Sequence, residues 1–236
     1  MENPIAYMPI SLQKILRRLL ARSTNIVRRC IFRLHGLCVV LLYRIGFPYS
    51  TPDRLNLCSG PIKIPQYLNV DICPQADLYL DLEQHALPFR GDSFQSVICI
   101  SSINYFSKNR ARFIIKEVYR VLQPGGIARF ATQDFRSITE KYLQNDTNFF
   151  FEKLPNGKDR FIGDTICDKI NSWFYGYAFA KGRSCRYFYD FETLAALFHD
   201  AGFRTVEKMN YTESRLPNIE LIDNRPDQMF FLEAVK

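Results

Sequence analysis

The chain has 236 residues, of which 47% are hydrophobic, enough for one α/β domain with extensions and too apolar for a disordered protein. The net charge of +7 lies entirely in residues 1–54, which hold nine Lys and Arg and two acidic residues, while the 22 basic and 22 acidic residues that follow cancel. A nucleic-acid partner is therefore not expected, because phosphate neutralisation needs a basic face on the domain. Seven cysteines without a Cys-x-x-Cys pair indicate reduced thiols in a cytoplasmic protein, and three scattered histidines predict no metal site.

The first 52 residues are predicted to form a basic amphipathic helical extension and a linker. Between residues 10 and 45, apolar residues recur at helical spacing with Lys and Arg between them. The apolar run at 37–43 is too short to cross a bilayer, which takes about 20 residues. Three interpretations stay open for the extension: packing on the domain, peripheral contact with the inner face of the membrane through residues 10–45, or binding of a partner.

Residues 53–236 are predicted to form one domain in which strands and helices alternate. Such alternation predicts a Rossmann-like, seven-stranded, mainly parallel sheet that is covered on both faces. The expected strands are 54–58, 67–71, 77–81, 96–101, 127–133, 204–210 and 228–235, and the expected helices are 61–64, 107–122, 136–145 and 191–201.

A glycine turn follows the first predicted strand, at Leu57-Cys58-Ser59-Gly60, and the next strand ends on Asp71, 11 residues after Gly60. A strand that stops in a glycine turn leaves backbone N–H groups free, and a carboxylate at the tip of the next strand can accept two ribose hydroxyls. A dinucleotide-binding unit places its acid about 20 residues on, so the spacing argues against NAD. A positive φ at Cys58 would strain its side chain.

These motifs resemble those of class I S-adenosylmethionine (SAM) dependent methyltransferases, in particular a bacterial type 11-like branch in which a Gly-Cys-Gly turn leads quickly to an Asn-Val-Asp strand. The resemblance covers about residues 54–135 and implies the class I methyltransferase fold, with the last two strands at an antiparallel edge. This chain has Ile103-Asn104-Tyr105-Phe106 where the family often has Leu-Glu-His-Phe, so no acid or base role carries over there. The matching stretches are 57–61 with 67–72, Asp81-Leu82, 87–94, and Glu117-Val118-Tyr119-Arg120-Val121-Leu122-Gln123-Pro124-Gly125-Gly126.

The resemblance implies SAM as the cofactor, bound at the carboxyl ends of strands one to four. Asp71 would hold the ribose, Asp81-Leu82 the adenine edge and Ser101 the methionyl part. The alternative interpretation makes Asp71 and Asp81 turn-forming residues without a ligand. The expected cofactor contacts are Leu57, Cys58, Ser59, Gly60, Asp71, Asp81, Leu82 and Ser101.

Acceptor groups are expected after strand five. Asp134 follows that strand and is the candidate base or substrate-orienting group, or alternatively the cap of the next helix. Residues 147–190 interleave aromatic and basic side chains and are predicted to form a lid over the strand ends, with Trp173, Tyr175 and Tyr187 as acceptor contacts. In the alternative interpretation, most of these aromatics form a second core.

The sequence therefore predicts SAM-dependent methyl transfer to a small molecule or a glycan precursor, with O-methylation of a sugar hydroxyl as the first choice. Two alternatives stay open: a non-catalytic binding or scaffold protein that lost SAM affinity through Cys58, and a nucleotide-dependent oxidoreductase. The sequence leaves the oligomeric state undetermined.

Overall fold

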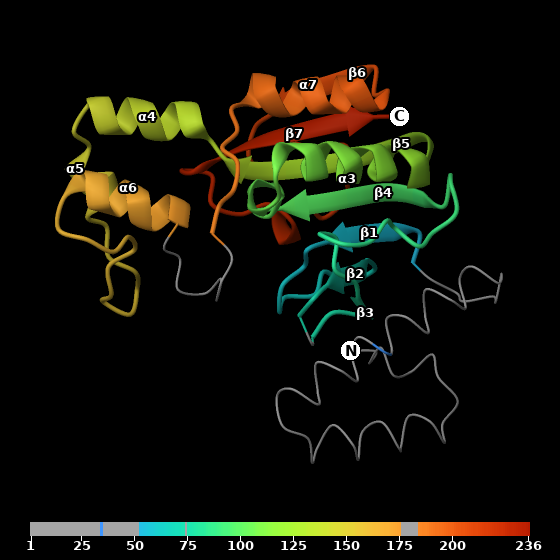
Figure 1. The fold of residues 1–236 in the computed structure, drawn as a ribbon, viewed down its shortest axis with the longest axis horizontal. Coiled ribbons are helices and arrows are strands. Elements are labelled where there is room, and N and C mark those ends of the chain that lie inside the picture. Colours follow the sequence, from blue (N-terminus) through green and yellow to red (C-terminus); the bar gives the residue numbers. More distant parts are fainter. Residues whose placement is uncertain (1–33, 35–51, 74, 176–183) are drawn as a thin grey trace, which may run out of the picture.

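A computed structural model describes residue 34 and residues 52–73, 75–175 and 184–236. Its seven-stranded sheet has the order β3-β2-β1-β4-β5-β7-β6 (Figure 1). Strands β1 to β5 are parallel to one another, and β7 is antiparallel to both β5 and β6. The predicted mainly parallel sheet with an antiparallel edge is thus confirmed. The strands are β1 (Arg54–Leu57), β2 (Leu68–Asp71), β3 (Leu78–Tyr79), β4 (Phe94–Ile100), β5 (Leu122–Gln133), β6 (Thr205–Met209) and β7 (Met229–Val235).

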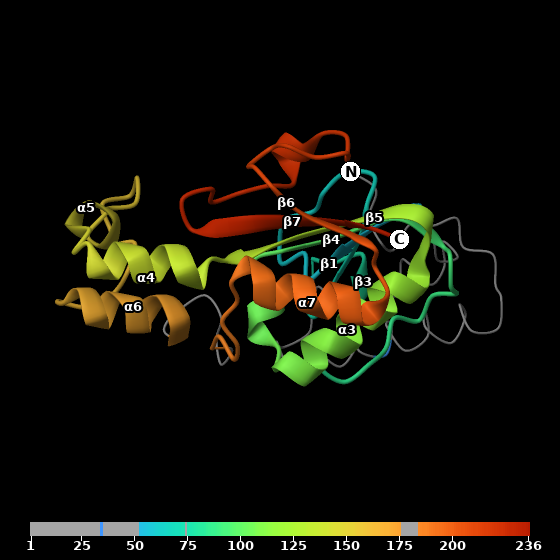
Figure 2. The same ribbon diagram turned by 90° about the horizontal axis from the view of Figure 1, so that it is seen from above.

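Two helices, α3 (Lys108–Val121) and α7 (Phe191–Ala201), lie side by side on one face of the sheet (Figure 2). Each begins at a side-chain cap, since Ser107 Oγ accepts a hydrogen bond from the Arg110 amide and Asp190 Oδ1 accepts one from the Thr193 amide. Their apolar sides join the inward residues of β1, β4, β5 and β7 in the main core. This layer fixes the central strands whose carboxyl ends carry the candidate site.

The opposite face of the sheet is covered by the β6–β7 connection, residues 210–228, which includes the short helix η3 (Ile219–Leu221) (Figure 2). Leu216, Ile219 and Ile222 of the connection pack there against Tyr67 and Ile98. The connection thus covers this face of the sheet, as a crossover helix does in a doubly wound sheet.

A buried ion pair fastens this connection to the sheet. Arg129 of β5 is fully buried, and its guanidinium Nη2 lies 2.5 Å from Asp223 Oδ2 while its Nε donates to Asp223 Oδ1 at 3.2 Å. The same guanidinium donates to the backbone carbonyls of Glu213 at 3.1 Å and Asn210 at 3.3 Å. Nearly all its hydrogen-bonding capacity is therefore met inside the protein, as a buried charge requires.

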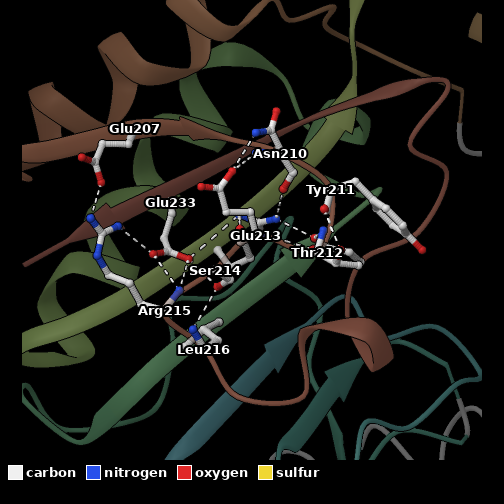
Figure 3. Close-up of polar contacts among 11 residues, drawn as sticks. Glu207, Asn210, Tyr211, Thr212, Glu213, Ser214, Arg215, Leu216 and Glu233 are labelled. Carbon is white, nitrogen blue, oxygen red and sulfur yellow. Dashed lines mark hydrogen bonds and ion pairs between the residues drawn. The ribbon is translucent and has the colours of Figure 1, made fainter.

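A second carboxylate completes the network from β7 (Figure 3). Glu233, fully buried, accepts from Ser214 Oγ at 2.5 Å and from Arg215 Nη1 at 2.8 Å, and Arg215 also pairs with Glu207 on β6 at 2.5 Å. Two arginines thus balance the acids that hold residues 210–223 on the sheet.

The link between β1 and β2 departs from the sequence prediction. Residues 61–64 form a turn and a loop, so the prediction of a helix there was wrong. Pro65 disfavours helical geometry at Ile64, the residue before it. The Asn69 side chain then takes both backbone groups of Ile64, accepting from its amide at 2.9 Å and donating to its carbonyl at 3.2 Å. The two parallel strands are joined without a crossover helix.

Between β5 and α7 lies an insertion with α4 (Phe135–Leu143), α5 (Thr147–Phe150) and α6 (Ile166–Tyr175), beyond the edge of the sheet where β4 and β5 end (Figure 1). Helices α5 and α6 were not predicted from the sequence. Their inward aromatics form a separate core, with Trp173 only 2% exposed. This core consists of Ile138, Phe149, Phe150, Phe161 and Trp173.

The predictions for the amino-terminal extension, including membrane contact through residues 10–45, lie outside the described residues apart from Leu34. In the described ranges, no helix is long and apolar enough to cross a membrane. Those same ranges hold no cluster of His, Cys, Asp or Glu side chains able to bind a metal ion.

Arg129→Met should lower the free energy of unfolding by about 3–5 kcal/mol, because Asp223 would remain buried without its counter-charge. Chemical denaturation followed by circular dichroism measures this. The exposed Arg204 serves as the control, since Arg204→Met should change stability by no more than about 0.5 kcal/mol. Equal stability of the two variants would contradict a structural role for the buried pair.

Trp173→Ala should lower the free energy of unfolding by about 3–5 kcal/mol, because it empties the centre of the insertion core. Tyr175, on the same helix but 57% exposed, provides the matched control. If thermal melting shows Tyr175→Ala to be as destabilising as Trp173→Ala, Trp173 is not at the centre of the insertion core.

Candidate active site

The turn after β1 is tied to the end of β2. Cys58 and Gly60 both have left-handed backbone conformations, with φ of 56° and 61°. The Ser59 amide donates to the Val70 carbonyl at 3.2 Å, and the Gly60 amide donates to Asp71 Oδ2 at 2.9 Å. These amides, expected from the sequence to be free for a ligand, are instead used to hold the two strand ends together.

Asp71 keeps capacity for a ligand despite these bonds. Its Oδ2 accepts from Gly60 and its Oδ1 accepts from the Cys73 amide at 2.7 Å, an Asx turn of the kind in the alternative interpretation. A carboxylate oxygen has two acceptor positions, so each oxygen can still accept one hydroxyl. A Cβ added at Gly60 would meet no atom within 4 Å, so the space beside the turn is open. Asp71 thus has the acceptor capacity that two vicinal ribose hydroxyls require.

The end of β4 is joined to the same turn. Ser101 is left-handed, with φ of 62°, and its Oγ donates to Asn224 Oδ1 at 3.3 Å. Ser102 Oγ donates to the Cys58 carbonyl at 3.4 Å. Two neighbouring strands thus end in non-glycine residues with positive φ, and backbone strain of this kind clusters at functional sites.

The remaining expected cofactor contacts differ in how a ligand could reach them. The side chains of Leu57 and Leu82 are buried in the main core, so only their backbone atoms are available. The Leu82 carbonyl already accepts from Arg110 Nε at 2.5 Å. Asp81 is half-buried and accepts from the Glu83 amide at 3.0 Å, which is the turn-forming arrangement. Contact with adenine stays a prediction for Asp81.

Asp134 caps helix α4, as the alternative interpretation held. Its Oδ1 accepts from the amides of Arg136 at 3.1 Å and Ser137 at 3.4 Å, and its Oδ2 lies 3.9 Å from Lys208 Nζ. The carboxylate is thus directed to the helix terminus and to a cation on β6. A role as base stays a prediction that this geometry does not favour.

The three expected acceptor contacts do not form one surface. Trp173 is buried in the insertion core, and its Nε1 donates to Gln228 Oε1 at 3.0 Å, so the indole has no face open to an acceptor. Tyr175 is exposed at the end of α6. Tyr187 is half-buried, with its ring centroid 4.9 Å from that of Tyr189. Of these three residues, only Tyr175 and Tyr187 are exposed enough to contact an acceptor directly.

A buried polar group that the sequence analysis did not single out lies after β4, in the short helix η2 (Ile103–Tyr105). The Asn104 carbonyl accepts from the amides of Arg186 at 2.9 Å and Tyr187 at 3.2 Å, which docks residues 185–189 on the sheet. Asn104 Oδ1 and the Tyr189 hydroxyl are buried without a hydrogen-bond partner among the described residues. Burial, followed by the neighbouring Tyr187 and Cys185, raises the pKa of Tyr189. The sequence signal for this buried group is Asn104 itself, which stands where the resembled family often has Glu.

Cys58→Gly should raise the free energy of unfolding by up to about 1 kcal/mol. Glycine removes about 1–2 kcal/mol of left-handed strain, which outweighs its cost of about 0.4–1 kcal/mol through the unfolded chain. Cys73, which does not have positive φ, provides the control. Denaturation should show Cys73→Gly to be destabilising, whereas a loss of stability from Cys58→Gly similar to that from Cys73→Gly would contradict strain at the turn.

Among solved structures, the chain is similar to a SAM-dependent methyltransferase from Mesorhizobium loti, with a TM-score of 0.43 and 17% identity over 83% of this chain and 96% of that one. It is also similar to phosphoethanolamine N-methyltransferase 2 of Haemonchus contortus in complex with SAM, with a TM-score of 0.44 and 14% identity over 86% of this chain and 52% of that one.

Sequence comparison gives a closer relationship. The chain is 32% identical over 136 residues to the ubiquinone/menaquinone biosynthesis C-methyltransferase UbiE of Pectobacterium atrosepticum, and 30% identical to the protein of that name from Escherichia coli K12. The match covers 57% of this chain and 48% of each relative, about half their length. The model of the ubiE/COQ5 methyltransferase family matches residues 73–216, more than half of the chain. The chain therefore belongs to the ubiE/COQ5 methyltransferase family.

Proposed function

We propose that the protein transfers a methyl group from SAM to an acceptor at the carboxyl edge of its sheet. The observation that carries this proposal is the corner formed by Gly60 and Asp71, where a fixed carboxylate with spare acceptor capacity lies beside a turn that is open at Gly60. Membership of a methyltransferase family supports it. When bound, SAM supplies a methyl group already activated on a sulfonium, so the chain's own task is to hold and orient the two reactants.

The residues divide this task between them. Asp71 accepts the two ribose hydroxyls, and its bonds to Gly60 and Cys73 hold the carboxylate in one orientation. Ser101 and Ser102 fix the end of β4 against the β1 turn and against Asn224, so that the edge is rigid before a ligand arrives. Such preorganisation lowers the ordering cost of binding.

A nucleotide-dependent oxidoreductase fits the same corner poorly. A dinucleotide's pyrophosphate is held by free amides at the start of a helix that follows the glycine turn. Here residues 61–64 form no helix, and the amides of Ser59 and Gly60 are already bonded to β2. This geometry supports SAM over NAD as the ligand.

The choice of acceptor rests on the relatives. The names of both relatives describe C-methyltransferases of ubiquinone and menaquinone biosynthesis, and we infer a carbon acceptor for this chain as the first candidate. Methylation of a sugar hydroxyl, the first choice from the sequence, has no support among them. The capped carboxylate of Asp134 also gives no free base for an alcohol acceptor.

Isothermal titration of the intact chain with SAM, S-adenosylhomocysteine and NAD tests the proposal. We expect binding of the first two and none of NAD. A chain that binds none of the three would instead match the non-catalytic scaffold of the sequence analysis.

Asp71→Asn should weaken SAM binding by about 1.5–3 kcal/mol, because two hydrogen bonds to a charged acceptor are lost or weakened. Asp92 lies near the opposite edge of the sheet and pairs with Lys236 at 2.7 Å, so Asp92→Asn is the matched control. Both variants should melt as folded proteins. An unchanged dissociation constant in folded Asp71→Asn would remove Asp71 from the site.

A further inference from the structure

The end of the β6–β7 connection brings one cation to the candidate site. Asp223 is held from behind by the buried Arg129, and the next residue, Asn224, contacts Ser101 at the carboxyl end of β4. Arg225 follows directly. The buried ion pair therefore fixes the position at which the connection passes from the face of the sheet opposite α3 and α7 to the edge where β4 ends. Arg225 lies at that position.

The backbone of Arg225 is fixed in a conformation that arginine rarely adopts. Its φ is 53°, and its carbonyl accepts from the amides of Gln228 at 3.1 Å and Met229 at 3.2 Å. Met229 in turn begins β7 and contacts Ser101 Oγ through its sulfur at 3.3 Å. A left-handed residue that is not glycine costs about 1–2 kcal/mol, so the surrounding bonds must hold it there.

The charge of Arg225 is exposed and forms no ion pair with any acid of residues 52–73, 75–175 and 184–236. Its positive charge affects the pKa of Tyr105, a residue of η2 that follows Ser101 by four positions in the sequence. Burial and the Cys185 thiol raise the pKa of Tyr105, and the positive charge of Arg225 opposes that rise. Arg225 directly follows Asn224, which contacts Ser101, so it lies beside the segment that follows β4, where the methionyl part of SAM is expected.

We propose that Arg225 binds the carboxylate of the methionyl part of SAM. This inference rests on the proposed function, since it assigns a residue to one end of the same ligand. Asp71 would hold the ribose and Arg225 the amino-acid end, from opposite sides of the β1 and β4 strand ends. A guanidinium suits this role because its planar fork can donate two parallel hydrogen bonds to a carboxylate.

An anionic group on the acceptor would offer Arg225 the same chemistry. The two sources are separated by comparing S-adenosylhomocysteine with 5′-methylthioadenosine, which keeps the adenosyl part and lacks the amino acid. Titration calorimetry of both compounds is carried out with the intact wild-type chain and with Arg225→Gln, Arg225→Lys and Arg225→Gly. Arg204→Gln is the control, since Arg204 is exposed and follows α7.

Wild type should bind both compounds. Arg225→Gln should weaken S-adenosylhomocysteine binding about 10- to 150-fold, as expected for a lost charged hydrogen-bonding pair, and leave 5′-methylthioadenosine within about twofold. Arg225→Lys should fall between, because an ammonium lacks the fork. Arg204→Gln should change neither affinity. Arg225→Gly keeps the left-handed turn without strain, so it gives the same test if the glutamine variant fails to fold.

Three other results would contradict one of the two proposals, and each can be told apart from the others. Wild type that binds neither compound overturns the proposed function itself. Equal weakening of both compounds by Arg225→Gln would show that Arg225 acts through the turn, and the carboxylate assignment would fall. Unchanged affinity for both would also overturn it, leaving the acceptor as the remaining anionic partner for this cation.

Discussion

The structure depends on the buried ion pair between Arg129 and Asp223. It holds the β6–β7 connection on a face of the sheet that the connection itself must cover. The same connection then contacts Ser101 through Asn224, and it reaches the insertion through Gln228, which accepts from Trp173. A charge in the centre of a strand is costly, and here its cost is offset by a full set of acceptors. Sheet, strand ends and insertion are therefore held in one arrangement by one network.

The Asp71 carboxylate has two roles in the candidate site, one structural and one in binding a ligand. Asp71 closes the β1 turn by accepting from Gly60, and each of its oxygens keeps one acceptor position for a ligand. Cys58 and Ser101 take up left-handed conformations beside it, so two of the strained residues lie at the edge where a ligand would bind.

The sequence predicted most of the sheet because strand alternation and the Pro-Gly-Gly motif are local signals. It failed at 61–64, where a helix was expected but the Asn69 side chain binds both backbone groups of Ile64. Arg129 was also not singled out, because its hydrogen-bond partners lie 81 to 94 positions away in the sequence and no local pattern marks them. Trp173 was assigned to the acceptor surface, yet burial decides such roles and the composition of a segment does not. The place of Asp71 on the edge was predictable because the sequence pattern puts it at the end of the second strand, whereas its contact with SAM stays a prediction.

A crystal structure of the intact chain grown with S-adenosylhomocysteine would test the account most directly. We predict density for the ligand across the carboxyl ends of β1, β2 and β4, with both ribose hydroxyls on Asp71 and the amino-acid carboxylate beside Arg225. Ligand density away from this edge, or none at a saturating concentration, would contradict the account.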